Sequence, residues 1–144
     1  MANSRTHDRS ISLATVPYAL AAVWLTGNHG YGVVSAITFL WSGLYLSPDL
    51  DIRSDPFKRW GLLKWYWLPY QKLIPHRSIW SHGPIIGSQL RILYLAVPWC
   101  LAFTAMGFGN VLASHLIHYS DLCLSAAIAC EASALVHLFM DWIN

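Results

Sequence analysis

The chain has 144 residues, and we expect a single domain over residues 1–144. Hydrophobic residues make up 56% of it and charged residues only 11%, against about 25% in ordinary soluble domains. The net charge of +2 is too small to indicate nucleic-acid binding. Because so few charges could hardly cover a small soluble protein, the composition favours a membrane protein, and eight Trp and seven Tyr residues are typical of membrane interfaces.

Four apolar segments are long enough to cross a bilayer as helices. We expect these spans at about residues 11–27, 31–47, 84–107 and 122–143. The third carries Arg91 near its start and Pro98, which can kink a helix. The fourth contains three polar residues that must face protein, water or a metal: Glu131, His137 and Asp141. The predicted fold is all-α, a membrane-embedded bundle of about four helices.

Lysine and arginine are distributed unevenly between the ends of these spans. Arg5 and Arg9 precede the first span, whereas the connections near residues 28–30 and 108–121 contain neither lysine nor arginine. Six more lie between the second and third spans: Arg53, Lys58, Arg59, Lys64, Lys72 and Arg77. The positive-inside rule therefore predicts that the N-terminus and residues 48–83 lie in the cytoplasm. We expect an uncleaved first helix in place of a signal peptide.

The connection between the second and third spans has an unusual composition. Within residues 48–83, the stretch DPFKRWGLLKWYWLPYQKLIP is aromatic, basic and interrupted by prolines. This pattern is typical of one or two short helices in the headgroup layer, with Trp rings in the lipid and Lys or Arg reaching water. An ordinary membrane-proximal loop with an aromatic belt would have the same composition. Either interpretation predicts membrane lipid as a partner.

Acidic residues and histidines gather at the ends that the charge rule places in the cytoplasm. They are, in chain order, His7, Asp8, Asp49, Asp51, His76, His82, His137 and Asp141. Imidazole and carboxylate are the ligands that zinc, manganese and iron prefer among the common side chains. Because bundled helices bring their ends to a common rim, we expect a site there for one or two divalent ions, with zinc the first choice and manganese or iron the others.

The spacing of these residues sharpens the expectation. His137 and Asp141 are four apart, so they share a helix face and can hold one ion together. Asp49 and Asp51 would project the same way from an extended turn. Glu131 lies about 9 Å deeper along the helix than His137 and is rotated by about 120°. It is placed for a deeper ion or for a hydrogen bond to a ligand histidine.

Each of these groups also has a simpler interpretation. His7 and Asp8 could belong to a solvated tail, and Asp49 with Asp51 could cap a helix or pair with Arg53. The histidines of HRSIWSH could be incidental to a helix start, and the last pair could be a simple hydrogen bond. Because all four groups fall on one side, we favour the metal site. A second series on the opposite side is more typical of a polar helix edge: His115, His118 and Asp121.

Four stretches also carry a family resemblance. They are RTHD at 5–8, SPDLDI at 47–52, KRWGLLKWYWLPYQKLIPHRSIWSHGPIIG at 58–87, and Glu131 followed by His137 and Asp141. With these the chain closely resembles an uncharacterised bacterial family, common in cyanobacteria, of predicted metal-binding membrane proteins. More distantly it is similar to inner-membrane metal-dependent hydrolases, which are likened to helical zinc phospholipase C enzymes. The resemblance implies a bacterial inner or thylakoid membrane and a metal role for His7, Asp8, Asp49, Asp51, His76, His82, Glu131, His137 and Asp141.

Two functions are compatible with such a site. The first is a metal-dependent hydrolase of a phosphoester or lipid-like substrate, because a divalent ion lowers the pKa of bound water to about 7. Arg77 and Glu131 are then the candidate catalytic residues; the Arg77 guanidinium could hold a phosphoryl oxygen, or else bind lipid phosphate or Asp51. The alternative is a non-catalytic assembly or interaction subunit whose metal joins four helix ends. The sequence identifies no protein partner.

Overall fold

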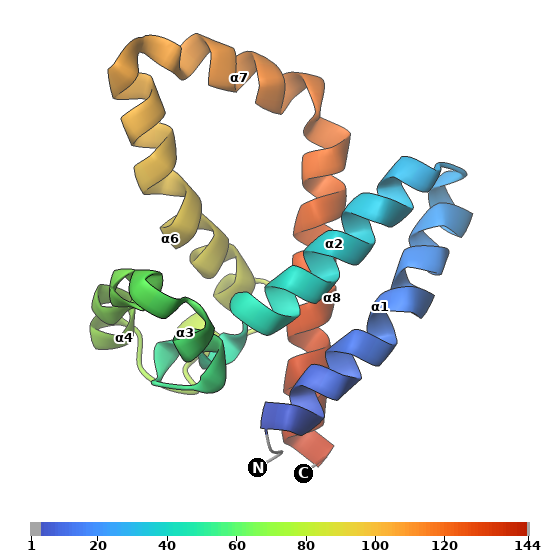
Figure 1. The fold of residues 1–144 in the computed structure, drawn as a ribbon, viewed down its shortest axis with the longest axis vertical. Helices are drawn as coiled ribbons and strands as arrows, with labels where there is room; N and C mark the ends of the chain where they lie inside the picture. Colours follow the sequence, from blue (N-terminus) through green and yellow to red (C-terminus); the bar gives the residue numbers. More distant parts are fainter. Residues whose placement is uncertain (1–3, 144) are drawn as a thin grey trace.

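The computed structural model describes residues 4–143, and every regular element in this range is helical (Figure 1). Four long helices set its dimensions: α1 (Ser4–Thr26), α2 (His29–Tyr45), α6 (Ile86–Phe103) and α8 (Ser120–Ile143). The all-α expectation is confirmed. α1 begins at Ser4 and not near residue 11, so the motif that contains His7 and Asp8 is helical and not a loose tail.

The helices α1, α2 and α8 form the packed part of the bundle, with α2 in contact with both of the others. Small polar side chains join α2 to α8: the hydroxyls of Ser35 and Ser125 are 3.0 Å apart, and those of Ser42 and Ser133 are 2.7 Å apart. Such pairs let helices approach closely and satisfy hydroxyl groups away from water. α1 begins and α8 ends at the same end of the bundle (Figure 1).

Residues 48–83 fold into a series of short helices beside that same end (Figure 1). They are η1 (Pro48–Asp51), α3 (Asp55–Arg59), η2 (Gly61–Trp67), α4 (Leu68–Leu73) and α5 (Ile79–His82). Two serines start the first two of them: the side chain of Ser47 accepts a hydrogen bond from the Asp49 N–H, and that of Ser54 accepts one from the Phe57 N–H. The Arg59 guanidinium anchors the connection to α2 by donating a hydrogen bond to the Leu44 carbonyl oxygen.

The tryptophans of this connection differ from the expectation. Trp67 is fully buried in the protein, where it packs on Trp60 and Tyr70, whereas Trp65 is 60% exposed. The connection therefore has its own aromatic core, and only part of its aromatic surface faces outward. The reason is that consecutive residues of a short helix point in different directions, so a run of aromatic residues cannot all face one medium.

α6 leads away from α8, and α7 (Gly109–His118) returns to it at the end opposite the termini (Figure 1). Pro98 lies within α6, and a π-helical turn, η3 (Thr104–Phe108), joins α6 to α7 with a kink at Gly107, where φ is 85°. The sequence suggested a connection over residues 108–121, but most of it is helical. Its apolar residues and the lack of proline allow the helix to form.

Three helical stretches are long and apolar enough to cross a membrane: His29–Asp51, Ile86–His118 and Ser120–Ile143. α1 is not among them. The expected first span, at about residues 11–27, therefore stays a prediction. Large apolar side chains are exposed along α1, α6 and α7, among them Trp24, Trp99 and Ile117.

Candidate metal centre

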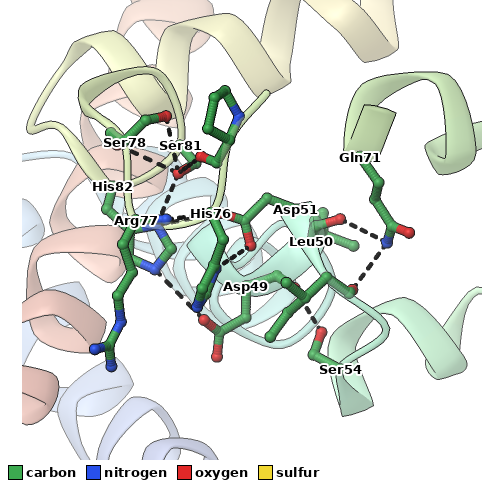
Figure 2. A network of polar contacts seen from close by, with 12 residues as sticks. Asp49, Leu50, Asp51, Ser54, Gln71, His76, Arg77, Ser78, Ser81 and His82 are labelled. Carbon is green, nitrogen blue, oxygen red and sulfur yellow. Dashed lines mark hydrogen bonds and ion pairs between the residues drawn. The ribbon is translucent and has the colours of Figure 1, made fainter. Parts of the chain in front are cut away.

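Ligand-type side chains converge from four segments at the end of the bundle where the termini lie. η1 provides Asp49 and Asp51. A side chain of another helix, α4, holds the backbone of η1 in place. Gln71 Nε2 on α4 donates hydrogen bonds to the carbonyl oxygens of Leu50 and Ile52, at 2.9 and 2.8 Å (Figure 2). These bonds fix the direction in which the two carboxylates of η1 point.

Asp49 lies between two imidazoles. Its Oδ1 is 3.4 Å from His82 Nε2 on α5, and its Oδ2 is 3.5 Å from His137 Nε2 on α8. The carboxylate of Asp141, one turn further along α8, is 3.5 Å from the same His137 nitrogen. Ligand atoms of these four residues all lie within 4.8 Å of one another. Because a tetrahedral zinc ion at about 2.1 Å from its ligands separates them by about 3.4 Å, this spacing suits one cation.

His7 of α1 completes the edge of this cluster. Its Nε2 is 3.3 Å from Asp141 Oδ1, and its ring stacks on that of His137 with centroids 4.1 Å apart. Burial, assisted by the neighbouring His137, lowers the pKa of His7. A neutral imidazole can donate a lone pair to a cation, so His7 is a further candidate ligand.

Asp51 makes a different set of contacts. Its buried carboxylate lies 2.9 Å from His76 Nδ1, accepts the Arg77 N–H at 3.3 Å, and lies 3.5 Å from His82 Nδ1 (Figure 2). It thus stands on the Nδ1 side of His82, while Nε2 of that ring faces Asp49. A carboxylate behind a histidine that binds metal through its other nitrogen is a common outer-shell arrangement. Asp51, His76 and His82 also form a group compact enough for a cation.

Two buried imidazole nitrogens show that these residues fit a metal ion. His82 Nε2 and His137 Nε2 are buried, and neither forms a hydrogen bond within the part of the chain described here. Leaving a buried polar atom without a partner costs about 1–3 kcal/mol. Both nitrogens face Asp49, and the other nitrogen of His137 lies 3.3 Å from the Ser47 hydroxyl. A divalent cation such as zinc would satisfy both atoms, so the donor set fits it.

Asp8 and Glu131 are not brought into the cluster. The carboxylate of Asp8 pairs with the Arg59 guanidinium of α3. Glu131 accepts hydrogen bonds from the Ile85 N–H, at 2.9 Å, and from the Ser88 hydroxyl, at the start of α6. Asp8 therefore ties α1 to α3, and Glu131 ties α8 to α6. Neither belongs to the compact ligand groups found among the described residues, although Asp8 lines the same cavity as Asp49.

Of the interactions predicted for Arg77, the pairing of its guanidinium with Asp51 is not found, and its contact with a phosphoryl oxygen stays a prediction. Only its backbone N–H contacts Asp51, and its exposed side chain extends away from that carboxylate (Figure 2).

On the far side of the molecule, His115 Nδ1 lies 2.8 Å from the Val111 carbonyl oxygen. The suggested series of His115, His118 and Asp121 does not form one of the compact ligand groups found among the described residues.

Three supporting residues were not predicted. Ser47 and Ser81 place hydroxyls at the Nδ1 atoms of His137 and His82, at 3.3 and 2.9 Å. The buried guanidinium of Arg91 donates a hydrogen bond to the Ser81 carbonyl oxygen. The sequence does indicate the two serines, since Ser47 directly precedes PDLD and Ser81 directly precedes His82. Arg91 was visible only as a charge in an apolar helix.

Glu131→Gln tests the separation between Glu131 and the cluster. Losing an outer-shell partner of a metal ligand costs about 10- to 100-fold in metal affinity, whereas this change should leave the affinity within about twofold. Glutamine keeps the shape of the side chain and can still accept the Ile85 N–H. Elemental analysis of the purified variant would check the result. A tenfold or greater loss of metal would mean that Glu131 acts on the site.

His82 gives the metal centre an expected pH dependence. Burial alone would lower the pKa of His82, but the carboxylates of Asp49 and Asp51 outweigh it and raise the pKa from 6.5 to about 9. At neutral pH, binding a cation at Nε2 must therefore displace a proton. Apparent metal affinity should rise about tenfold per pH unit from about pH 7 to about pH 9, and then level off.

Calorimetry in buffers of different ionisation enthalpy would count the protons released on metal binding. An affinity that does not change with pH would contradict the assignment of His82 as a ligand. Without metal, the stability of the folded chain should change with pH in the opposite direction to the metal affinity. A pKa raised above 6.5 stabilises the folded chain at low pH, and that stabilisation is lost as the pH rises through about 9.

The fold and this donor set define an all-helical metal-binding protein. The chain matches, over residues 2–144, the family described as "Uncharacterized metal-binding protein (DUF2227)", and it belongs to that family. An "Uncharacterized protein" of Aquifex aeolicus (strain VF5) is 38% identical over 66 residues, which are 45% of this chain and 46% of the relative. No solved structure matches the chain. The expected metal-binding family is confirmed, whereas the likeness to hydrolases and the cyanobacterial source stay predictions.

Proposed function

We propose that this protein is a membrane-embedded, metal-dependent hydrolase that acts on a phosphoester or lipid-like substrate. Its divalent ion, zinc in the first place, would be held by four residues: Asp49, His82, His137 and Asp141. The observation that carries this proposal is the pair of buried Nε2 atoms of His82 and His137, which lie on either side of one carboxylate and form no hydrogen bond within the described residues. His7 would complete the site on the side of α1.

An adjoining cavity supports a catalytic role over a purely structural one. It has a volume of about 60 Å³ and is lined by His7, Asp49 and His137 among others. A cavity needs only about 10–15 Å³ of this kind of space to hold a water molecule. Catalytic metal sites keep a position open for water or substrate, whereas structural zinc is enclosed by protein. When bound, a divalent ion supplies the Lewis acidity that activates water near neutral pH.

His76 is the residue best placed to move a proton. Asp51 holds its Nδ1 at 2.9 Å, so Nε2 is left for exchange, and the His76 side chain is 34% exposed. Its ring lies 5.3 Å from that of His82, measured between centroids. A half-exposed imidazole oriented by a buried carboxylate beside a metal ligand is suited to general acid–base catalysis. Asp51 then acts as a positioning residue for both rings.

The membrane location rests on the three apolar stretches and on their exposed side chains. The proposed orientation places the N-terminus and residues 48–83 in the cytoplasm, because lysine and arginine concentrate there. The metal centre would then lie at the cytoplasmic edge of the bilayer, at the level of the headgroups. A site at that depth can receive a substrate that contains a lipid or phosphoester group.

The test uses full-length protein purified in detergent. Metal content is measured by elemental analysis, and turnover is measured on bis(p-nitrophenyl) phosphate and on phospholipids. His137→Ala should lose both metal and turnover, whereas His76→Gln should keep metal and lose turnover. His118→Ala, at an exposed histidine of α7, is the matched control and should keep both. Stoichiometric metal without turnover on any substrate would contradict the hydrolase and favour a metal that joins η1, α5 and α8.

A further inference from the structure

We propose that the groove beside α3 and η2 binds the headgroup of an anionic phospholipid. This proposal rests on the proposed membrane location but not on hydrolysis. The groove has a volume of about 230 Å³. It is lined by three basic and three apolar side chains, namely Arg53, Lys58 and Lys64, and Phe57, Trp65 and Leu68. This combination of cations and apolar groups matches the two halves of a charged lipid.

The charges of the groove favour an anion. Of the described residues that line it, none is acidic. The remaining cation of α3, Arg59, turns away to pair with Asp8. Lys58 also contacts Asp55 outside the groove lining, at 2.8 Å, but both side chains are largely exposed, so this pair is weak and can rearrange. A phosphodiester entering the groove would therefore meet a surplus of positive charge.

The surface next to the groove favours a lipid over a free anion. On η2, Leu62 is 89% exposed, Leu63 is 66% exposed and Trp65 is 60% exposed. Gly61 allows the turn that begins η2, with φ at 54°, after which these side chains point outward. Exposed apolar side chains beside lysines and arginines are typical of segments that insert into the headgroup layer. A soluble phosphate would need the cations alone.

Lys64 lies between the basic side chains of the groove and the exposed apolar side chains of η2. Its ammonium lies 5.3 Å from the centre of the Trp65 ring, a cation–π contact that holds it over the apolar surface. A phospholipid whose phosphate is bound at Lys64 would have its acyl chains against Leu62 and Leu63. The short helices stand beside the end of the bundle that contains the metal centre (Figure 1). A lipid held there would fix the depth of that centre in the membrane.

The experiment compares lipids and lysines. Native mass spectrometry of the full-length protein in detergent would measure binding of dioleoyl phosphatidylglycerol and of dioleoyl phosphatidylcholine. The wild type should prefer phosphatidylglycerol, and Lys64→Gln should weaken that binding about fivefold, the effect of one cation near an anionic headgroup. Lys72→Gln removes an exposed lysine of α4 outside the groove and should change nothing. Lys64→Arg should retain the preference.

Three results would overturn the assignment. They are equal binding of the two lipids by the wild type, equal loss of binding in Lys64→Gln and Lys72→Gln, and displacement of the lipid by inorganic phosphate alone. Elemental analysis of each variant separates this question from the metal centre, since the lysine variants should keep the metal content of the wild type. A wild-type protein that binds its metal fully but shows no lipid preference would therefore count against the groove alone.

Discussion

His137→Ala is expected to lower metal affinity by more than about 100-fold, beyond the 10- to 100-fold cost of losing an outer-shell partner. The buried Nε2 of His137 lies 3.5 Å from a carboxylate oxygen of Asp49 and 3.5 Å from one of Asp141. Alanine removes a nitrogen ligand and leaves two acidic side chains to hold the ion with His82. Competition with a chromophoric chelator would measure the change.

The same variant should also lose stabilisation by metal. A ligand present at 1,000 times its dissociation constant stabilises the folded state by about 4 kcal/mol, so metal should raise the melting temperature of the wild type and not that of His137→Ala. His118→Ala is the control, because it removes an exposed histidine of α7. Wild-type metal affinity in His137→Ala would show that the ion is not bound at this cluster.

Asp51→Asn is expected to reduce metal affinity about 10- to 100-fold, although Asp51 need not touch the ion. Its carboxylate stands 3.5 Å from His82 Nδ1 and 2.9 Å from His76 Nδ1. The negative charge raises the pKa of His82, and it fixes the orientation in which His82 presents Nε2 to Asp49. Asparagine keeps the size of the side chain but loses this charge.

Stoichiometry separates the two roles open to Asp51. If it orients His82, Asp51→Asn should still bind the same number of ions, only more weakly. If it binds a second ion with His76, the number of ions per chain should fall from two to one. Asp121→Asn, at an exposed acid in the first turn of α8, is the matched control and should leave both quantities unchanged. Unchanged affinity in Asp51→Asn would contradict both roles.

Much of the candidate centre could be predicted from the sequence, because two simple patterns determine it. Histidine and aspartate recur at the helix ends that adjoin the segments rich in lysine and arginine, and bundled helices bring such ends together. The four-residue spacing of His137 and Asp141 places both on one helix face. The structure then brings Asp49 and His82 to the same place, as expected for ligands at the rim of a bundle.

The departures arise from long-range contacts that no local pattern contains. Asp8 has a ligand-type side chain, but the Arg59 guanidinium lies close enough to pair with it. Glu131 instead lies at the start of α6, where it accepts a hydrogen bond from the N–H of Ile85, a residue with a positive φ of 64°. Likewise, the length of the first apolar segment did not reveal that α1 continues back to Ser4, which carries His7 into the cluster.

An anomalous difference map tests the central claim most directly. Crystals of the full-length protein grown with zinc would be measured on both sides of the zinc absorption edge. A peak should appear between Asp49 and the Nε2 atoms of His82 and His137, with Asp141 in contact. A map without a peak there, or with its strongest peak beside His115 and His118, would contradict the metal centre described above.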